Sequence, residues 1–325
     1  MKNQAALFQE VGGPNVFKIT DIGEPQNPGP DQVLIRHTAI GVNYIDAYYR
    51  SGLYKLKNFP FVPGIEAVGV IEAVGENVTI KLGTRVAYAL ANSGAYCHKR
   101  VIESKKLVPV PDDISDATAA ACLLKGMTAH MLIYRVFRLQ RSDTVLVHNA
   151  TDGTGHILCQ WIKQIGATII GTVDHPEKIA VAKRYGCDHV ANYKTDDVVQ
   201  LVRKVTKGEG VTIVYDGVGK DTFGISIQSL MPMGFYVSYD QSSGQIPGIN
   251  ILSLATKSLY LSRPSVQYYK SNTIEMALTA NEIFERIRKG QITPTIGATY
   301  SLSDAAAAHA DLAEQKTIGS IILKP

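Results

Sequence analysis

The sequence lacks any long hydrophobic run. None of its 325 residues belongs to an apolar stretch of about 18 residues, the length that a membrane-spanning helix needs. The N-terminal segment MKNQAALFQEVGG also lacks the basic and then apolar pattern of a secretory signal peptide. No repeated or low-complexity segment occurs. We therefore expect a cytoplasmic protein with no membrane partner.

The sequence also lacks a block of charge of one sign. Its 33 Lys and Arg and 29 Asp and Glu are interspersed and leave a net charge of +4, and 45% of residues are hydrophobic. This composition is ordinary for a globular protein with room for two domains. The dispersed charge argues against nucleic acid as a partner.

Cysteines are few, and none is spaced as CxxC. The four are Cys97, Cys122, Cys159 and Cys187. Such spacing offers neither a disulfide framework nor a four-cysteine zinc site, so we expect reduced thiols.

The most informative stretch runs from Thr144 to Asp174. Thr144–His148 is a short β-branched run, Ile157–Ile165 has apolar residues on one helical face, and Thr168–Val173 is a second β-rich run. This order predicts a strand, a helix and a strand. The loop between the first strand and the helix is the place where such units hold a pyrophosphate.

That loop only partly matches the GxGxxG pattern. The three glycine positions fall on Ala150, Asp152 and Gly155, with Gly153 and Thr154 between the last two. We predict that these five residues bind a dinucleotide. An alternative interpretation makes Asp152 the cap of the helix and the glycines ordinary turn residues, and both interpretations can hold together if the carboxylate faces away from the phosphates.

Asp174 ends the second strand, about 20 positions after Gly155. This is the spacing at which an acidic residue binds a ribose hydroxyl. We therefore include Asp174 among the predicted cofactor-binding residues.

Strands and helices alternate after this unit, which predicts a doubly wound α/β domain with its ligand at the carboxyl ends of the strands. The predicted strands are Asp188–Ala191, Val211–Asp216, Phe235–Tyr239 and Ser258–Ser262, and the predicted helices are Pro176–Tyr185, Asp196–Thr206 and Asp221–Leu230. Beyond this domain, Thr273–Lys289 is predicted as a long amphipathic helix, and Thr299–Leu323 as a return to helix and then strand. Residues 1–120 instead favour strands, at Val33–His37, Ala67–Val74, Arg85–Leu90, Ala95–Val101 and Lys106–Val108. Ser115–Leu139 turns helical, and Ser320–Leu323 is a final strand that we expect to rejoin the first domain.

An aromatic segment lies at residues 43–54. Asn43, Asp46 and Tyr48 can line a cleft for a flat apolar ligand. Alternatively, Tyr44, Tyr48 and Tyr49 pack at helical spacing against the core.

Several stretches resemble the zinc-free quinone oxidoreductase (zeta-crystallin-like) branch of the medium-chain dehydrogenase/reductase superfamily. They are GVNYIDAYYRSGLY (41–54), VPGIEAVGVIEAVGENV (62–78), LLKGMTAH (123–130), VHNATDGTGHILCQW (147–161), VYDGVGKDT (214–222) and SRPSVQYY (262–269). The resemblance implies a Rossmann domain, 125–263, inserted in a GroES-like, mainly β catalytic domain, 1–124 plus 264–325. It also implies a homodimer that reduces quinones with NADPH in an interdomain cleft.

The resemblance speaks against zinc. Zinc-dependent members carry a Cys where this chain has Asn43 and a GHE motif where it has Gly64, Ile65 and Glu66. Two ligands are therefore missing, and Glu66 becomes a structural or orienting carboxylate.

The resemblance also assigns site residues. The positions beside the nicotinamide, which we treat as catalytic, are Asn43, Asp46, Tyr48 and Tyr54. The positions near the nucleotide are Lys125, Thr128, Lys178, Tyr193, Gly217, Ser238, Arg263 and Ser320. Alone, Tyr193 reads as a loop residue after a strand and Lys178 as an exposed helical residue.

Asp174 departs from the relatives, which usually have a small residue there when they use NADPH. A carboxylate about 4 Å from the 2′-phosphate would cost on the order of 4 kcal/mol at an effective dielectric constant near 20. Lys178, with His175, can offset that cost if Asp174 turns toward them. We predict NADPH as cofactor, with NADH as the alternative that Asp174 favours.

These observations predict a reductase of quinones or similar small electron acceptors, in which Tyr48, or water held by Asn43 and Asp46, hydrogen-bonds the reduced oxygen. Reduction of activated alkenes such as enones is an alternative. From another class, an RNA-binding or crystallin-like protein keeps the same fold. A scaffold in which Asp152 and Asp174 have abolished nucleotide binding is the third alternative.

Overall fold

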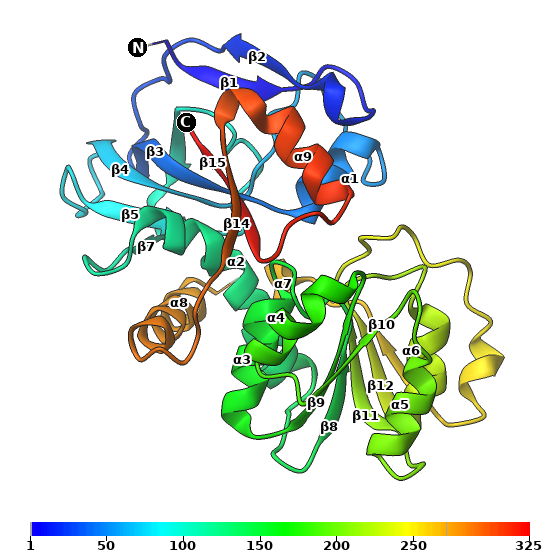
Figure 1. The fold of residues 1–325 in the computed structure, drawn as a ribbon. Coiled ribbons are helices and arrows are strands. Elements are labelled where there is room, and N and C mark those ends of the chain that lie inside the picture. The colour runs from blue at the N-terminus through cyan, green and yellow to red at the C-terminus, as the bar shows by residue number, and fades with distance from the viewer. Residues whose placement is uncertain (1, 271) are drawn as a thin grey trace. The chain divides into compact units, whose positions relative to one another are not determined.

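The computed structural model describes residues 2–270 and 272–325, which divide into two compact units (Figure 1). Unit 1 is assigned Met1–Met127, Lys270–Arg288 and Pro294–Pro325, and unit 2 is assigned Thr128–Tyr269 and Lys289–Thr293. The domain limits 1–124 plus 264–325 and 125–263 came from the resemblance and stay a prediction.

Unit 1 is built on a seven-stranded sheet in the order β14-β15-β3-β4-β5-β7, with β6 pairing with β3, and on a separate antiparallel pair β1-β2. The strands are β1 Gln4–Leu7, β2 Lys18–Asp21, β3 Gln32–Val42, β4 Ala67–Val74, β5 Arg85–Tyr88, β6 Lys99–Glu103, β7 Leu107–Pro109, β14 Ile296–Ser301 and β15 Ser320–Lys324. Strand β15 pairs antiparallel with β3, as Figure 1 also shows. This confirms that the C-terminal segment returns to the first sheet.

Four α-helices accompany these strands or link them to unit 2 in the described chain. They are α1 Tyr44–Ser51, α2 Asp116–Met131, α8 Thr273–Arg288 and α9 Ala305–Ala313, with 3-10 turns η1 Pro14–Val16, η2 Ser104–Lys106 and η6 Leu302–Asp304. Helix α1 is followed by Gly52, whose φ of 82° lies in the left-handed region that glycine adopts without steric cost.

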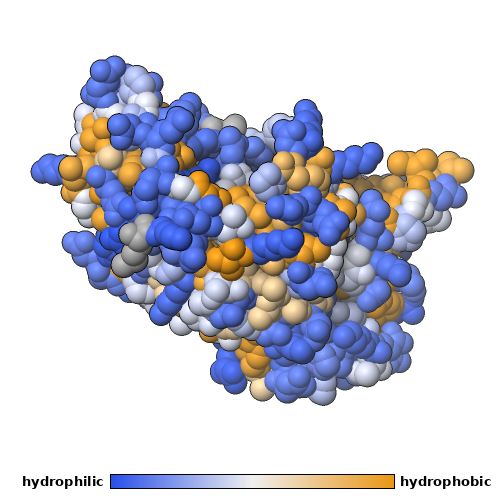
Figure 2. Space-filling model, turned by 90° about the horizontal axis from the view of Figure 1, so that it is seen from above, coloured by the Kyte–Doolittle hydropathy of each residue, from blue (hydrophilic) through white to orange (hydrophobic). Residues whose placement is uncertain are grey.

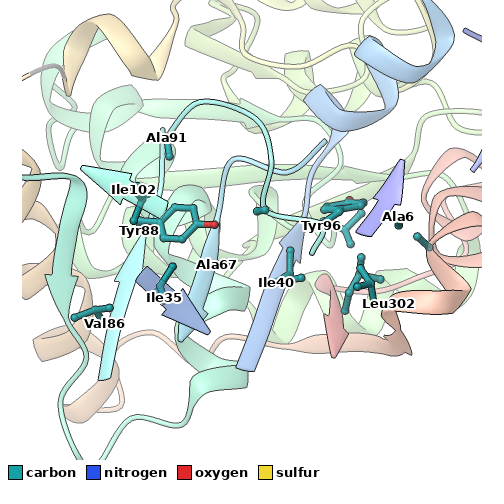
Figure 3. Packing of buried hydrophobic residues seen from close by; sticks show 14 of the residues in the cluster. Ala6, Ile35, Ile40, Ala67, Val86, Tyr88, Ala91, Tyr96, Ile102 and Leu302 are labelled. Carbon is teal, nitrogen blue, oxygen red and sulfur yellow. The ribbon is translucent and has the colours of Figure 1, made fainter. Parts of the chain in front are cut away.

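The core of unit 1 contains large side chains from strands that are distant in the sequence (Figure 3). Tyr88 and Tyr96 are both fully buried among Ile35 and Ile40. Each buried hydroxyl has a partner: that of Tyr88 lies 2.9 Å from Nε2 of His37. A buried aliphatic or aromatic side chain of this kind stabilises a fold by about 1.5–3 kcal/mol.

Unit 2 contains a six-stranded, entirely parallel sheet in the order β10-β9-β8-β11-β12-β13. The strands are β8 Thr144–Val147, β9 Thr168–Val173, β10 His189–Asn192, β11 Val211–Asp216, β12 Leu230–Ser238 and β13 Tyr260–Ser262. The strand order reverses between β8 and β11, the position at which doubly wound sheets bind ligands. The predicted doubly wound fold is confirmed.

Helices flank this sheet on both sides. The helical segments are η3 Leu132–Val136, α3 Gly155–Ile165, η4 Pro176–Lys178, α4 Ile179–Arg184, α5 Val198–Val205, α6 Phe223–Ser229, η5 Ile251–Leu254 and α7 Val266–Tyr269. Figure 1 shows α3 and α4 on one side and α5 and α6 on the other. This arrangement follows from right-handed crossovers on either side of the reversal point.

Three local predictions were wrong. Ala95–Val101 is not one strand: β6 begins only at Lys99, because Ala95 and Tyr96 donate backbone hydrogen bonds to Gly64 and Pro63 instead. The helix predicted from Pro176 is divided into η4 and α4. The helix expected from Thr299 onward begins only after Ser301, because Ile296–Ser301 form β14, whose residues alternate between half-buried and exposed.

No helix in the described part of the chain is long and apolar enough to cross a membrane. On the face seen in Figure 2, hydrophilic side chains cover most of the surface and hydrophobic ones gather in smaller patches between them.

Candidate functional site

All strands of the unit 2 sheet end at one edge, which we call the carboxyl edge. The predicted cofactor residues of this unit that follow or end those strands are Ala150, Asp152, Gly153, Thr154 and Gly155 after β8, Asp174 and Lys178 after β9, Tyr193 after β10, Gly217 after β11, Ser238 at the end of β12 and Arg263 after β13. Because the strands are parallel, residues far apart in the sequence share this edge.

The loop after β8 needs glycine at Gly155. A Cβ there would lie 1.9 Å from the carbonyl oxygen of Asn149, so no other residue fits without moving the backbone. Asn149 itself has a φ of 56°, and Ala150 donates its N–H to Thr172 at 3.0 Å. The loop is thereby held tightly against the sheet at the N-terminus of α3.

Asp152 caps the start of this helix. Its Oδ1 accepts a hydrogen bond of 2.8 Å from the N–H of Gly155, the first residue of α3. The capping interpretation is therefore confirmed. Burial raises the pKa of the Asp152 carboxyl to about 7, so near neutral pH this group is only partly ionised beside the predicted phosphate site.

Asp174 and Lys178 form a buried ion pair. Lys178 Nζ lies 2.8 Å from Asp174 Oδ1, and the two residues are 5% and 3% exposed. His175 Nε2 lies 3.8 Å from Oδ2 of the same carboxylate. The interpretation of Lys178 as an exposed helical residue was therefore wrong, and Asp174 does turn toward Lys178.

Tyr193 lies beside this pair. It follows β10, is 8% exposed and donates its backbone N–H to Val173, the residue before Asp174, at 3.0 Å. Burial first, and then the charge of Asp174, raise the pKa of its hydroxyl. Both residues thus end neighbouring strands at one place.

Gly217 and Arg263, two further residues of the carboxyl edge, lie against the segment at the end of β12. A Cβ on Gly217 would come within 2.6 Å of the Tyr239 hydroxyl. The guanidinium of Arg263 donates hydrogen bonds to the carbonyl oxygens of Ser238 (3.1 Å) and Tyr239 (2.8 Å). The geometry gives Arg263 a role in holding the end of β12, while its predicted place near the nucleotide stays a prediction.

Unit 1 contains a buried polar network around Lys125. Its ammonium donates to Asn43 Oδ1 at 2.8 Å and to Glu66 Oε2 at 3.3 Å, and Asn43 Nδ2 donates to the same Glu66 oxygen at 3.1 Å. Glu66 Oε1 accepts from the N–H of Leu124 at 2.6 Å. Sequence reasoning did not predict this pairing, although a lysine and a glutamate inside apolar runs were its signal.

Asp46 lies inside unit 1 with 0% exposure. One carboxylate oxygen accepts from the N–H of Gly64 (2.9 Å), and the other accepts from the N–H of Asn43 (3.1 Å) and the hydroxyl of Tyr96 (3.3 Å). Burial raises its pKa to about 7. Asp46 thus fixes the start of α1 and, through it, the position of Asn43.

The aromatic segment packs as the second interpretation predicted, while the cleft for a flat ligand stays a prediction. The rings of Tyr44 and Tyr48 are 6.3 Å apart and those of Tyr48 and Tyr54 are 5.4 Å apart. Tyr48 is packed, with 8% exposure, whereas Tyr54 is 37% exposed. Tyr54 therefore presents more of its side chain to solvent than Tyr48 does.

The two remaining predicted residues lie in different surroundings. Ser320 is 1% exposed and its hydroxyl donates to the carbonyl of Ala121 at 2.7 Å. Thr128 lies on α2 and is half-buried. Nucleotide contacts by either residue stay a prediction.

The residues that stand where the resemblance implies zinc ligands in zinc-dependent members are poor ligands for zinc. Asn43, Ile65 and Glu66 offer one carboxylate, and Lys125 already places a cation on that carboxylate. No group of three or more potential ligands from His, Cys, Asp and Glu occurs among residues 2–270 and 272–325. This donor set is unlike the three protein ligands of catalytic zinc sites.

Two family models match the chain. One, described as alcohol dehydrogenase GroES-like domain, covers residues 29–130, and the other, described as zinc-binding dehydrogenase, covers residues 153–280. A quinone oxidoreductase of Pseudomonas aeruginosa is 41% identical over 320 residues, which are 98% of each chain. The chain belongs to the quinone oxidoreductase family of the medium-chain dehydrogenases/reductases. Its predicted combination of a GroES-like and a Rossmann domain is confirmed.

Two other members of this family bear on chemistry. A 2-haloacrylate reductase of Burkholderia is 39% identical over 329 residues, covering 99% of this chain and 98% of that protein. A solved structure of Escherichia coli quinone oxidoreductase complexed with NADPH is 38% identical, covers 99% of this chain and 100% of that one, and has a TM-score of 0.96.

Proposed function

We propose that this chain is an oxidoreductase that reduces quinones with a reduced nicotinamide dinucleotide, without zinc. The similarity to the Pseudomonas aeruginosa quinone oxidoreductase over 98% of both chains carries this proposal. The NADPH complex of the Escherichia coli relative supports NADPH as a dinucleotide that this fold can hold.

The carboxyl edge fits such a cofactor. Gly155 begins the 11-residue helix α3, whose first N–H groups and dipole suit a pyrophosphate. The missing Cβ at Gly155 lets the start of α3 approach the carbonyl group of Asn149 in the same loop, which leaves the backbone open to a phosphate. Asp174 supplies a buried oxygen that accepts no hydrogen bond in the described part of the chain, which suits a ribose hydroxyl.

The cofactor, when bound, supplies the hydride. In unit 1, Lys125 holds three N–H donors, of which Asn43 and Glu66 each accept one. We assign the third to a ligand oxygen, in keeping with the predicted place of Lys125 near the nicotinamide ribose. Because Asn43 and Glu66 fix the ammonium from two sides, its direction is set before any ligand binds.

Reduction of a quinone adds a hydride to the ring system and a proton to an oxygen. Tyr48 is the proposed donor to that oxygen, together with water held by Asn43. Asp46 acts as a positioning residue, since its carboxylate holds the N–H of Asn43. With no strong Lewis acid assigned to the site, substrates that already accept electrons readily are favoured.

The test of this function is turnover by the purified protein. Oxidation of the reduced dinucleotide should depend on added quinone, saturate with quinone concentration and persist after treatment with a chelator. Binding of the dinucleotide without any quinone-dependent oxidation would exclude the proposed activity.

Reduction of activated alkenes is a second candidate, which the Burkholderia 2-haloacrylate reductase supports. It needs the same hydride and the same proton donor. Rates on a quinone and on an α,β-unsaturated acid or ketone, measured side by side with one enzyme preparation, distinguish the two candidates.

We also propose a cytoplasmic homodimer. Strand β13 is the edge of the unit 2 sheet, and Tyr260 on it is 53% exposed, so a second copy can pair there. Light scattering of the purified protein tests the dimer.

The alternative of an RNA-binding protein requires an affinity for RNA stronger than roughly micromolar that falls steeply with salt.

A further inference from the structure

The carboxylate of Asp174 is half satisfied. Oδ1 is held by Lys178 Nζ at 2.8 Å, but Oδ2 accepts no hydrogen bond from any residue that the structure describes. His175 Nε2 lies 3.8 Å from Oδ2, beyond hydrogen-bond distance. Because Asp174 is only 3% exposed, Oδ2 is a buried acceptor, and a buried acceptor is normally hydrogen-bonded.

The position of this oxygen identifies the donor. Asp174 directly follows β9, the second strand of the βαβ unit whose first loop contains Gly155. In such units the residue at this place faces the adenosine ribose. A ribose 2′-hydroxyl carries no charge and can donate one hydrogen bond. Oδ2 has no such donor in the described part of the chain. A 2′-phosphate has no proton to spare and brings negative charge to a carboxylate.

Lys178 does not reverse this preference. Its ammonium already neutralises Asp174, so the buried pair offers an incoming phosphate no net positive charge. His175 is half-exposed and Lys194, with Nζ 6.0 Å from the ring centroid of Tyr193, is exposed. Exposed charges are screened by water and salt and contribute less than the buried carboxylate.

We propose that this chain binds NADH more tightly than NADPH, because Asp174 accepts the adenosine ribose 2′-hydroxyl and its partner Lys178 is already paired. This rests on the proposed function, in which a nicotinamide dinucleotide binds at the carboxyl edge of unit 2. It reverses the cofactor choice predicted from the sequence, where the turn of Asp174 toward Lys178 was expected to offset the cost of a 2′-phosphate. The observed pair removes repulsion but adds no net positive charge for a phosphate.

Isothermal titration calorimetry on the full-length protein tests the proposal with two ligand pairs. NADH and NADPH compare the whole cofactors, and 5′-AMP and 2′,5′-ADP isolate the contribution of the 2′-phosphate. A hydrogen bond to a charged acceptor is worth about tenfold or more in affinity. We expect NADH to bind about tenfold more tightly than NADPH, and 2′,5′-ADP to bind no more tightly than 5′-AMP.

Two variants locate the effect. Asp174→Ser removes the carboxylate and releases Lys178, so NADPH should bind at least tenfold more tightly than to the wild type, and adding Lys178→Met should cancel that gain. Asp174→Asn is the isosteric control: its amide oxygen still accepts the hydroxyl, so NADH affinity should fall only slightly while NADPH affinity rises. Thermal unfolding checks that each variant is folded.

The outcomes separate the two proposals. Tighter binding of NADPH and of 2′,5′-ADP by the wild type would overturn the assignment of Asp174 but leave a nicotinamide-dependent reductase intact. An unchanged NADPH affinity in folded Asp174→Ser would also overturn it. Binding of neither dinucleotide would remove the proposed function itself.

Discussion

Lys125 Nζ donates a 2.8 Å hydrogen bond to Oδ1 of Asn43, although the two residues are 82 positions apart. The bond connects α2 to the residue that precedes α1, and Glu66 on the intervening segment accepts from both side chains. Asn43 stands at one of the two positions where the resemblance implies a zinc ligand in zinc-dependent members, and here its amide contacts a cation and a carboxylate instead.

Lys125→Met should destabilise the protein by about 3–5 kcal/mol, because it leaves the Glu66 carboxylate buried without its cation. Chemical denaturation measures the change. The double variant Lys125→Met with Glu66→Gln should recover part of the loss, since it removes the stranded charge as well. A loss in the double variant equal to the sum of the losses in Lys125→Met and in Glu66→Gln would show that the two side chains are not coupled.

Gly155→Ala should weaken dinucleotide binding at least tenfold, because the added methyl group would overlap the carbonyl oxygen of Asn149. Titration of dinucleotide into the purified variant measures this. Gly224→Ala on α6 is the matched control: its Cβ meets no atom within 4 Å, and alanine favours a helix by up to about 1 kcal/mol. Normal binding by the Gly155 variant would mean that the loop does not hold the phosphates.

NADH affinity should fall as pH rises through about 7. The pKa of Asp152 is raised to about 7 by burial, so the carboxyl is neutral below this pH and negative above it, where it repels the cofactor phosphates. Titration calorimetry at pH 6 and pH 8 measures the effect. NADH is the better probe because a 2′-phosphate itself titrates near pH 6.

Asp152→Asn supplies the control for this pH dependence. The amide oxygen can still accept the N–H of Gly155, so the cap remains while the charge is lost. The variant should bind NADH equally at both pH values. A persistent fall in affinity would assign the titration to another group.

Tyr48→Phe should lower kcat for quinone reduction by about 100-fold or more and leave KM nearly unchanged, if its hydroxyl hydrogen-bonds the oxygen that is reduced. Tyr49→Phe, one residue along the same helix, is the control and should retain wild-type rates. An unchanged kcat in Tyr48→Phe would contradict this role for Tyr48 and would assign the hydrogen bond to the reduced oxygen to water held by Asn43.

The extent of sequence prediction differs between the two units. The parallel sheet could be predicted because each strand is a short apolar run and each crossover helix has one apolar face. Strand β14 was not predicted although Ile296, Ala298 and Tyr300 alternate with smaller or polar residues, because six residues with no fully buried position give only a weak signal. The late start of β6, at Lys99 instead of Ala95, likewise depends on the backbone hydrogen bond from Ala95 to Gly64. No local sequence pattern encodes that bond.

The site shows the same limit. Ala150, Gly155 and Asp174 could be placed at one edge from strand order alone, since parallel strands end together. The partner of each charged side chain could not be predicted. Whether Lys178 faces solvent or pairs with Asp174, and whether Lys125 meets Glu66, depends on tertiary packing that the spacing of the residues does not specify.

Quinone-dependent oxidation of the reduced dinucleotide by purified, chelator-treated protein tests the central claim most directly. We predict saturable turnover with NADH and with NADPH, at rates that the chelator does not change. Loss of turnover on chelation, restored by zinc, would contradict the account, as would an absence of oxidation under conditions in which calorimetry shows the dinucleotide bound.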